Sequence, residues 1–250
     1  MKREDENYLV RSFRQAMNRL ILLDYDGTLV DYASTPDLAK PPGNLFNPLL
    51  RLSKLPQTKV VIITGRSDED IDSFFGSLPI QIIAEHGAMI KELSGWQQLT
   101  QVDSNWIGAI REIFAPFAAD CPGSFVEVKK FSLAWHYRNA DKVSGLRVSK
   151  ALLKKLKSAK ELEGLTVLEG NKVIEIRKTD VHKGMAVNYL TSSQEYDFIL
   201  AIGDDRTDED MFKALVNNEN GFTIKVGSGE TFAKERIENV QQVIALLESL

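Results

Sequence analysis

The chain has 250 residues, of which 43% are hydrophobic and 26% charged, with a formal net charge of −4 at pH 7. This is the composition of an ordinary globular protein with enough apolar material for a core, and its mild acidity argues against a nucleic-acid-binding role. A single cysteine, Cys121, excludes an intramolecular disulfide. No stretch approaches the ~20 apolar residues of a membrane span, and the polar N-terminus lacks a signal-peptide core, so we expect a cytoplasmic location.

The first predicted element is a helix within residues 1–19. Tyr8, Leu9, Phe13 and Ala16 recur at helical spacing, which is typical of a helix with one buried face. This helix begins without an obvious cap or targeting features, as a fragment or the tail of a longer protein would.

The chain is organised around residues 20–29, LILLDYDGTL. A short apolar run that ends at a glycine turn predicts a buried strand of a parallel sheet. Ligands of such sheets bind beyond the carboxyl ends of the strands, where Asp24 and Asp26 fall. Two carboxylates there repel each other unless a cation joins them, and oxygen ligands favour Mg²⁺. The alternative is that both aspartates merely begin an Asp-Gly turn.

A second buried strand is predicted over 59–63, after a loop (31–44) and a helix (45–55). It ends in Thr64 and Gly65, and Ser67 opens the next helix as its predicted cap. A hydroxyl beside a helix N-terminus can donate to phosphate oxygens, so Thr64 is a candidate phosphate ligand.

The third apolar run, residues 79–90, contains Glu85, His86 and Gly87. His86 is either a functional group at a strand end or a satisfied structural residue, and the pattern does not separate the two. Residues 95–119 are predicted as an irregular, mainly helical connection.

Residues 123–177 have a different hydrophobic pattern from the preceding segments, because the apolar residues of FSLAWHYRN alternate with polar ones. Period-two alternation predicts antiparallel strands with one buried and one wet face. The order strand–strand–helix–strand–strand predicts a small α+β cap domain, residues 101–179, inserted into a core domain of residues 1–100 and 180–250. Flexible joints would let such a cap close over the core and exclude water.

The core is expected to resume with a helix over 179–190, capped by Asp180 and carrying Lys183 in its first turn. A lysine is unfavourable there unless an anion binds nearby. A fourth buried strand, 198–202, leads into Asp204, Asp205 and Asp208. A last strand in 221–229 and a closing helix over 230–249 complete an α/β fold.

Four motifs occur in an order that resembles the haloacid dehalogenase superfamily of phosphatases: DYDGTL, the Thr64 strand end, Lys183 and GDDRTDED. The resemblance implies a Rossmann-like parallel-sheet core with an inserted cap. It implies that Asp24 attacks phosphorus, forming an aspartyl-phosphate, and that Asp26 serves as general acid and base.

The same resemblance implies a phosphate site and a Mg²⁺ site. The phosphoryl group would be held by Thr64, Gly65 and Lys183. The Mg²⁺ ligands would be Asp24, the Asp26 carbonyl, Asp204 and either Asp208 or Asp205. No GxGxxG or GxxxxGK stretch follows the first strand, which disfavours a dinucleotide or P-loop site.

Finer segments, among them AEHGA, VEVKKFSLAWHYR and LEGNKVIEIR, resemble trehalose-6-phosphate phosphatases, alone or fused to a synthase. The resemblance implies that cap side chains grip the sugar hydroxyls: Glu127, Lys129, Arg138, Glu169 and Glu175. The alternatives are another sugar phosphatase, acting on sucrose 6-phosphate or a mannosyl phosphate, and a silent phosphosugar-binding domain that regulates a synthase partner. A silent domain is expected to lack some of the catalytic residues, whereas this chain has Asp24, Asp26, Thr64, Lys183 and Asp204.

Overall fold

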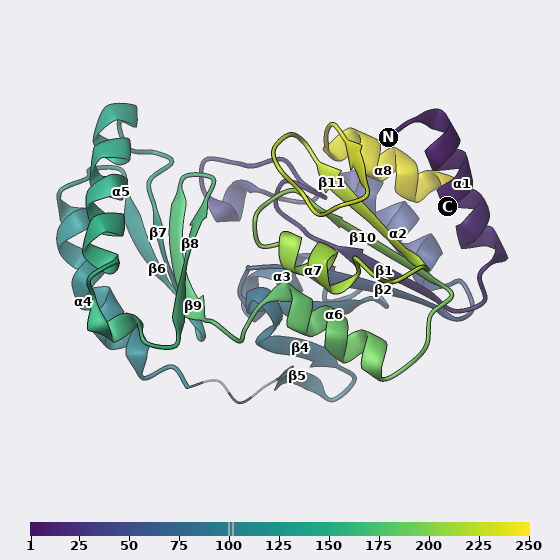
Figure 1. The fold of residues 1–250 in the computed structure, drawn as a ribbon, viewed down its shortest axis with the longest axis horizontal. Helices are drawn as coiled ribbons and strands as arrows, with labels where there is room; N and C mark the ends of the chain where they lie inside the picture. Colours follow the sequence, from purple (N-terminus) through teal and green to yellow (C-terminus); the bar gives the residue numbers. More distant parts are fainter. Residues whose placement is uncertain (100, 102) are drawn as a thin grey trace. The chain divides into compact units, whose positions relative to one another are not determined.

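The computed structural model describes residues 1–99, 101 and 103–250. The chain divides into two compact units, which we describe separately (Figure 1). The first unit combines Met1–Leu99 with His182–Leu250, and the second is the inserted segment Thr100–Val181. None of the helices in the described part of the chain is long and apolar enough to cross a membrane.

The first unit is built on one eight-stranded sheet with the order β12-β11-β10-β1-β2-β3-β4-β5. The strands are β1 (Arg19–Leu23), β2 (Thr58–Ile63), β3 (Gln81–Ala84), β4 (Met89–Glu92), β5 (Gly95–Gln98), β10 (Phe198–Gly203), β11 (Gly221–Val226) and β12 (Glu235–Ile237). The six from β12 to β3 are parallel, and β4 and β5 add an antiparallel hairpin. The predicted α/β class with a mainly parallel sheet is confirmed.

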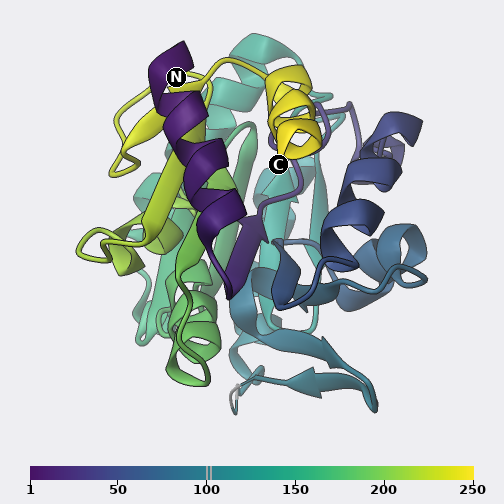
Figure 2. The same ribbon diagram turned by 90° about the vertical axis from the view of Figure 1, so that its right-hand side faces the viewer.

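Helices cover both faces of this sheet. They are α1 (Arg3–Gln15), α2 (Phe46–Ser53), α3 (Asp68–Phe75), α6 (Lys183–Ser192), α7 (Glu209–Ala214) and α8 (Val240–Ser249), with the short helices η1 (Pro36–Leu38), η2 (Gly43–Leu45) and η3 (Glu85–Gly87). On one face, α6 and α7 pack into a core with alternate residues of β1, such as Leu20 and Leu22. On the other, Arg14 of α1 and Arg51 of α2 donate to carbonyls at the end of α8, and Figure 2 shows α1 and α8 near each other.

Strand β1 is the centre of the sheet and carries the site. It pairs in parallel with β10 on one side and β2 on the other, and residues 20–23 are fully buried. A parallel strand buried on both faces is continuously apolar, and the apolar run of residues 20–23 predicted β1 for this reason. The carboxyl ends of β1, β2 and β10 therefore meet at one edge, where Asp24, Thr64 and Asp204 follow.

Three local predictions were wrong. Residues 95–98 form strand β5 and are not part of an irregular helical connection. Gly95 pairs with Glu92 across a tight turn, and pairing with β4 stabilises a strand whose own polar sequence does not indicate one. Residues 235–237 form β12, so the closing helix starts only at Val240. The cap of α6 is His182, whose Nδ1 accepts from the Met185 N–H at 3.2 Å, and not Asp180.

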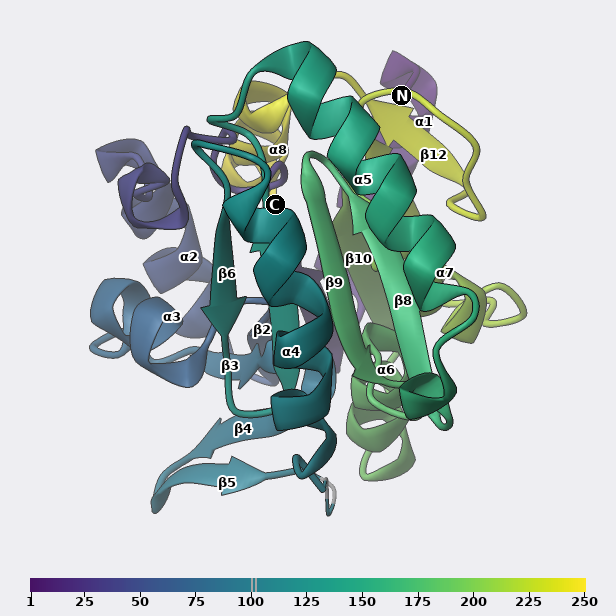
Figure 3. The same ribbon diagram turned by 90° about the vertical axis from the view of Figure 1, so that its left-hand side faces the viewer.

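The second unit is a four-stranded antiparallel sheet with two helices on one face (Figure 3). Its elements are α4 (Trp106–Ala119), β6 (Phe125–Val128), β7 (Ser132–His136), α5 (Lys142–Leu156), η4 (Lys160–Leu162), β8 (Leu165–Gly170) and β9 (Val173–Lys178). The strand order is β6-β7-β9-β8. Leu133, Trp135, Ile174 and Ile176 pack against α4 and α5, so the predicted strand–strand–helix–strand–strand order and its apolar face are confirmed.

Candidate active site

A buried lysine between two aspartates forms the centre of the site in the first unit. Lys183, the first residue of α6, donates from Nζ to Asp24 Oδ1 at 2.5 Å and to Asp208 Oδ1 at 2.7 Å. The exposed fractions of the three residues are 1%, 5% and 0%, in that order. A buried charge is tolerated only with compensating partners, so the three side chains form one interdependent unit.

The protonation of these groups reflects burial and crowding. Burial, with the neighbouring charge of Asp208, raises the pKa of Asp24 to about 7. Burial, with the charges of Asp24 and Asp208, raises the pKa of Asp204 to about 9. Burial alone would lower the pKa of Lys183, but the two carboxylates outweigh it and raise that pKa. Full ionisation of the three carboxyls would leave more negative charge than one lysine neutralises, so a bound cation would favour their ionised forms and lower both raised pKa values.

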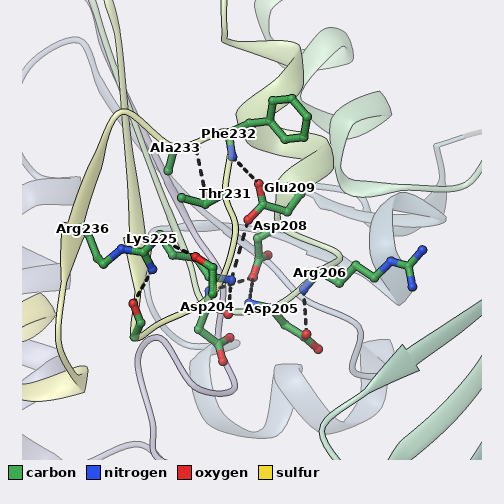
Figure 4. A network of polar contacts seen from close by, with 12 residues as sticks. Asp204, Asp205, Arg206, Asp208, Glu209, Lys225, Thr231, Phe232, Ala233 and Arg236 are labelled. Carbon is green, nitrogen blue, oxygen red and sulfur yellow. Dashed lines mark hydrogen bonds and ion pairs between the residues drawn. The ribbon is translucent and has the colours of Figure 1, made fainter.

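The loop after β10 is held by its own side chains and by β11 (Figure 4). The N–H groups of Asp204 and Asp205 donate to Asp208 Oδ2 at 2.9 and 3.0 Å. Lys225 of β11 donates to the Asp204 carbonyl, and its Nζ lies 3.7 Å from Glu209 Oε1. Both oxygens of Asp208 are thus used within the protein, one by Lys183 and the other by this turn.

The donor set fits a hard divalent cation. Asp24, Asp204 and Asp208 offer carboxylate oxygens that all lie within 4.8 Å of one another. Asp24 Oδ2 and Asp204 Oδ1 are buried and accept no hydrogen bond from any described residue. A buried acceptor without a donor is costly, and a cation with oxygen ligands would satisfy both atoms.

The residues that follow β2 and β3 are closely packed against each other, and two of them have strained backbone conformations. The hydroxyl oxygen of Thr64 accepts from the Arg66 N–H at 3.1 Å, so its own O–H remains able to donate. Gly65 lies against the imidazole of His86, and a Cβ at Gly65 would be 2.5 Å from that ring. Glu85 and His86 both have positive φ, 46° and 59°, and such strain is concentrated at functional sites.

Asp26 is oriented by an arginine that follows Thr64. Arg66 donates from Nε and Nη2 to the two oxygens of Asp26 at 2.8 and 2.7 Å, and Nη2 also donates to the Pro36 carbonyl at 2.7 Å. The guanidinium lies 4.9 Å from the Tyr25 ring centre. A bidentate arginine fixes both position and plane of a carboxylate, so Asp26 has a defined place at the site.

A polar cluster lies on one face of the sheet in the second unit. Glu127 and Glu175 both pair with Ala134, from opposite sides, and therefore share its face. Lys129 Nζ is 3.4 Å from Glu175 Oε1 and 3.9 Å from Glu127 Oε2, and His136 Nε2 is 2.7 Å from Glu127 Oε2. Burial raises the pKa of Glu127, but Lys129 and His136 outweigh burial and lower it.

The other two predicted sugar-binding residues are Glu169 and Arg138. Glu169 pairs with Ile174, a residue of the apolar core under α4 and α5, so the register assigns Glu169 to the opposite face of the sheet. Arg138 lies beyond the end of β7 and donates to the Asn171 carbonyl at 2.7 Å. Of the five candidates, the structure brings together Glu127, Lys129 and Glu175.

Four side chains were missed by the sequence reasoning: Tyr32, Arg66, His136 and Lys225. Tyr32 donates to Asp204 Oδ2 at 2.9 Å, and partial burial of this largely exposed residue, with nearby carboxylates, raises its pKa, so the phenol is a donor at neutral pH. Arg66 was detectable as a charged residue in the short turn between β2 and α3. Nothing in the sequence around Tyr32 or Lys225 indicated its partner, because each partner is distant along the chain.

The chain is similar to known proteins in sequence and in fold. A family model described as trehalose-phosphatase matches residues 22–242. A Thermoproteus tenax protein named bifunctional trehalose-6-phosphate synthase/phosphatase is 42% identical over 243 residues, covering 97% of this chain and 33% of that protein. The C-terminal domain of C. albicans trehalose-6-phosphate phosphatase matches with a TM-score of 0.91 and 30% identity, covering 97% of this chain and 95% of that one.

A more distant match gives the fold. BT1666 from Bacteroides thetaiotaomicron, a phosphatase of the haloalkanoate (HAD) superfamily, matches with a TM-score of 0.61 at 16% identity, covering 94% of this chain and 96% of that one. The fold is therefore of the haloacid dehalogenase type, as predicted. The chain spans about a third of the length of the curated relatives it matches. Because the family model matches most of the chain, the chain belongs to the trehalose-phosphatase family.

Proposed function

We propose that this chain hydrolyses trehalose 6-phosphate to trehalose and inorganic phosphate with the help of Mg²⁺. The observation that carries the proposal is the Asp24 carboxylate at the end of β1. One oxygen is held by Lys183, while the other is buried and accepts nothing from the described residues. A carboxylate fixed at one oxygen and open at the other suits a nucleophile.

Two carboxylates are the proposed Mg²⁺ ligands, Asp24 and Asp204, together with the Asp26 carbonyl. Asp208 would support them indirectly, since its oxygens already bind Lys183 and the Asp204–Asp205 turn. When bound, Mg²⁺ would neutralise charge on the transferring phosphoryl group. Asp205 is left out of the proposed ligand set, because the acids whose oxygens lie within 4.8 Å of one another are Asp24, Asp204 and Asp208.

The reaction would proceed in two displacements at phosphorus. In the first, an oxygen of Asp24 forms a bond to phosphorus while the bond to the sugar oxygen breaks, and Asp26 gives that oxygen a proton. In the second, Asp26 takes a proton from water, which attacks the aspartyl-phosphate and releases phosphate and free Asp24. Arg66 keeps the Asp26 carboxylate in place between these steps.

The phosphoryl oxygens would accept from donors at the start of α6 and at the end of β2. Lys183 supplies positive charge, and Thr64 an O–H whose oxygen is already oriented by the Arg66 N–H. Gly65 allows the backbone to approach closely. In phosphoryl transfer most catalysis is positioning and charge stabilisation, so a small and rigid set of groups is sufficient.

Sugar recognition is the proposed role of the second unit, as a cap domain. Glu127, Lys129 and Glu175 offer acceptors and donors in one ion-paired cluster, which suits a disaccharide with many hydroxyls. A synthase, fused or separate, is the proposed partner, because the Thermoproteus tenax relative carries both activities in its name. A cytoplasmic location remains a prediction.

The proposal is tested by measuring phosphate release from trehalose 6-phosphate, sucrose 6-phosphate and glucose 6-phosphate, with Mg²⁺ and with EDTA. We expect strong preference for trehalose 6-phosphate and no turnover in EDTA. Equal activity on all three would contradict the substrate assignment and favour a broader sugar phosphatase. Tight phosphosugar binding without turnover would instead identify a silent regulatory domain.

Glu127→Gln is expected to lower kcat/KM for trehalose 6-phosphate by about 10–100-fold. The reason is the loss of a charged acceptor, which contributes about 1.5–3 kcal/mol per hydrogen bond. Hydrolysis of p-nitrophenyl phosphate, which has no sugar, should be unaffected.

The matched control is Glu169→Gln, which alters a glutamate on the opposite face of the same sheet. It should change kcat/KM for trehalose 6-phosphate little. If Glu127→Gln reduces both substrates equally, Glu127 has no role in sugar recognition.

A further inference from the structure

The Asp204 carboxylate is held by the loop that follows β1. The Tyr32 hydroxyl donates to Asp204 Oδ2 at 2.9 Å, across 172 residues of sequence. The other oxygen, Oδ1, is buried and accepts no hydrogen bond within the described parts of the chain. The two oxygens therefore have different environments, and Tyr32 is the side-chain donor that distinguishes them.

The loop that presents Tyr32 has a fixed shape. Asp26 and Val30 form a bridge, and the Gly27 N–H donates to the Val30 carbonyl at 2.7 Å. Gly27 has φ of +86°, and a Cβ at this position would overlap the Asp204 carboxylate, including Oδ2. Gly27 thus leaves room for the same oxygen that Tyr32 binds. The loop therefore contacts the Asp204 carboxylate both through the Gly27 backbone and through the Tyr32 hydroxyl.

The backbone of Asp204 is fixed independently. Its N–H donates to Asp208 Oδ2 at 2.9 Å, and its carbonyl accepts from the ammonium of Lys225 (Figure 4). Rotation of the carboxylate plane remains, and for aspartate this torsion is broad and only weakly restricted by the chain itself. A donor on one oxygen selects the orientation.

We propose that Tyr32 is a positioning residue for the divalent cation: its hydroxyl fixes the Asp204 carboxylate so that Oδ1 faces the metal. The inference rests on the proposed Mg²⁺ site. Partners of this kind, which orient a metal ligand without touching the metal, typically change metal affinity 10- to 100-fold when removed. Tyr32 would thereby couple the loop after β1 to the loop after β10 through the ion.

The test is Mg²⁺ titration by isothermal calorimetry, without substrate, on the unaltered chain and on Tyr32→Phe. Phenylalanine keeps the ring and removes only the hydroxyl. We expect the Kd for Mg²⁺ to rise about tenfold or more, and the Mg²⁺ concentration for half-maximal phosphatase activity to rise by the same factor. Tyr189→Phe, at an exposed tyrosine of α6, is the matched control and should leave the Kd unchanged.

The outcomes separate the inference from the function on which it rests. Equal Mg²⁺ affinity in Tyr32→Phe and the unaltered chain would overturn the role of Tyr32 while leaving the metal site standing. A lower melting temperature of Tyr32→Phe in EDTA, with activity reduced at every Mg²⁺ concentration, would indicate a merely structural role and also overturn it. Absence of Mg²⁺ binding to the unaltered chain would overturn the proposed metal site, and the inference with it.

Discussion

Asp24→Asn is expected to abolish release of phosphate from trehalose 6-phosphate, with kcat falling by at least about four orders of magnitude. Asparagine has nearly the same shape as aspartate, but its amide cannot form the covalent phosphoryl intermediate. The remaining groups, including Lys183 and Thr64, would still bind the phosphoryl group. Single-turnover phosphate release with and without the substitution measures the loss directly.

The same substitution should not weaken the fold, which distinguishes a lost nucleophile from a damaged site. Asp24 has a pKa of about 7 in the folded chain against an ordinary value of 3.8. Its ionisation therefore opposes folding, by an amount that is zero below pH 4, grows as the pH rises to 7 and stays constant above. The neutral amide of the variant carries no such cost, and Lys183 keeps Asp208 as its partner.

Denaturant unfolding in EDTA measures this effect. At pH 8 the free energy of unfolding of Asp24→Asn should equal or exceed that of the unaltered chain, and the difference should vanish near pH 4. If activity and stability fall together at pH 8, the lost activity reports unfolding and not the loss of a nucleophile.

Lys183→Met should lower the free energy of unfolding in EDTA at pH 8 by about 3–5 kcal/mol, the usual cost of removing one partner of a buried ion pair. Two buried carboxylates, Asp24 and Asp208, would lose the cation that joins them. Lys183 itself lowers the pKa of Asp24, so without it that pKa rises further. Activity should also be lost, since the phosphoryl group loses its positive partner.

The dependence on pH and Mg²⁺ identifies charge as the cause. At pH 5.5 Asp24 would be protonated in the folded variant, so the deficit in unfolding free energy should shrink. Saturating Mg²⁺ at pH 8 should recover part of it. The control is Lys40→Met, which removes an exposed lysine and should change stability little. A deficit independent of both pH and Mg²⁺ would mean that lost packing, and not uncompensated charge, destabilises the variant.

The central part of the fold was predictable because its signals are local. Buried parallel strands must be continuously apolar, and β1, β2 and β10 were recognised for that reason. The groups that follow each strand then had to meet at one edge of the sheet. Asp24, Thr64 and Asp204 therefore followed from strand order, and Lys183 was notable as a lysine at the unfavourable end of a helix.

The elements that were missed depend on partners and not on their own sequence. Strand β5 has a polar sequence and forms because β4 pairs with it. The cap of α6 is a histidine, and residue preferences favour aspartate at that position, so Asp180 was preferred wrongly. Arg66 and Tyr32 lie on loops, and only the fold shows that they bind Asp26 and Asp204.

The order of the strands has a consequence for synthesis of the chain. The central strand β1 pairs with β2 soon after it is made, but its other neighbour is β10, where Leu20 pairs with Ile199. The second unit lies between them as one continuous segment, so all of its strands are available before β10 exists. At about 5–20 residues per second, β1 waits roughly 10–35 s for β10 on the ribosome.

During that interval one edge of β1 is unpaired, and an open apolar strand edge is prone to aggregation. The inserted unit is then expected to fold first and the catalytic sheet last. Because Asp24 and Lys183 come from opposite sides of the insertion, the site is assembled only when the sheet closes, and no nascent chain that ends before residue 183 can be active.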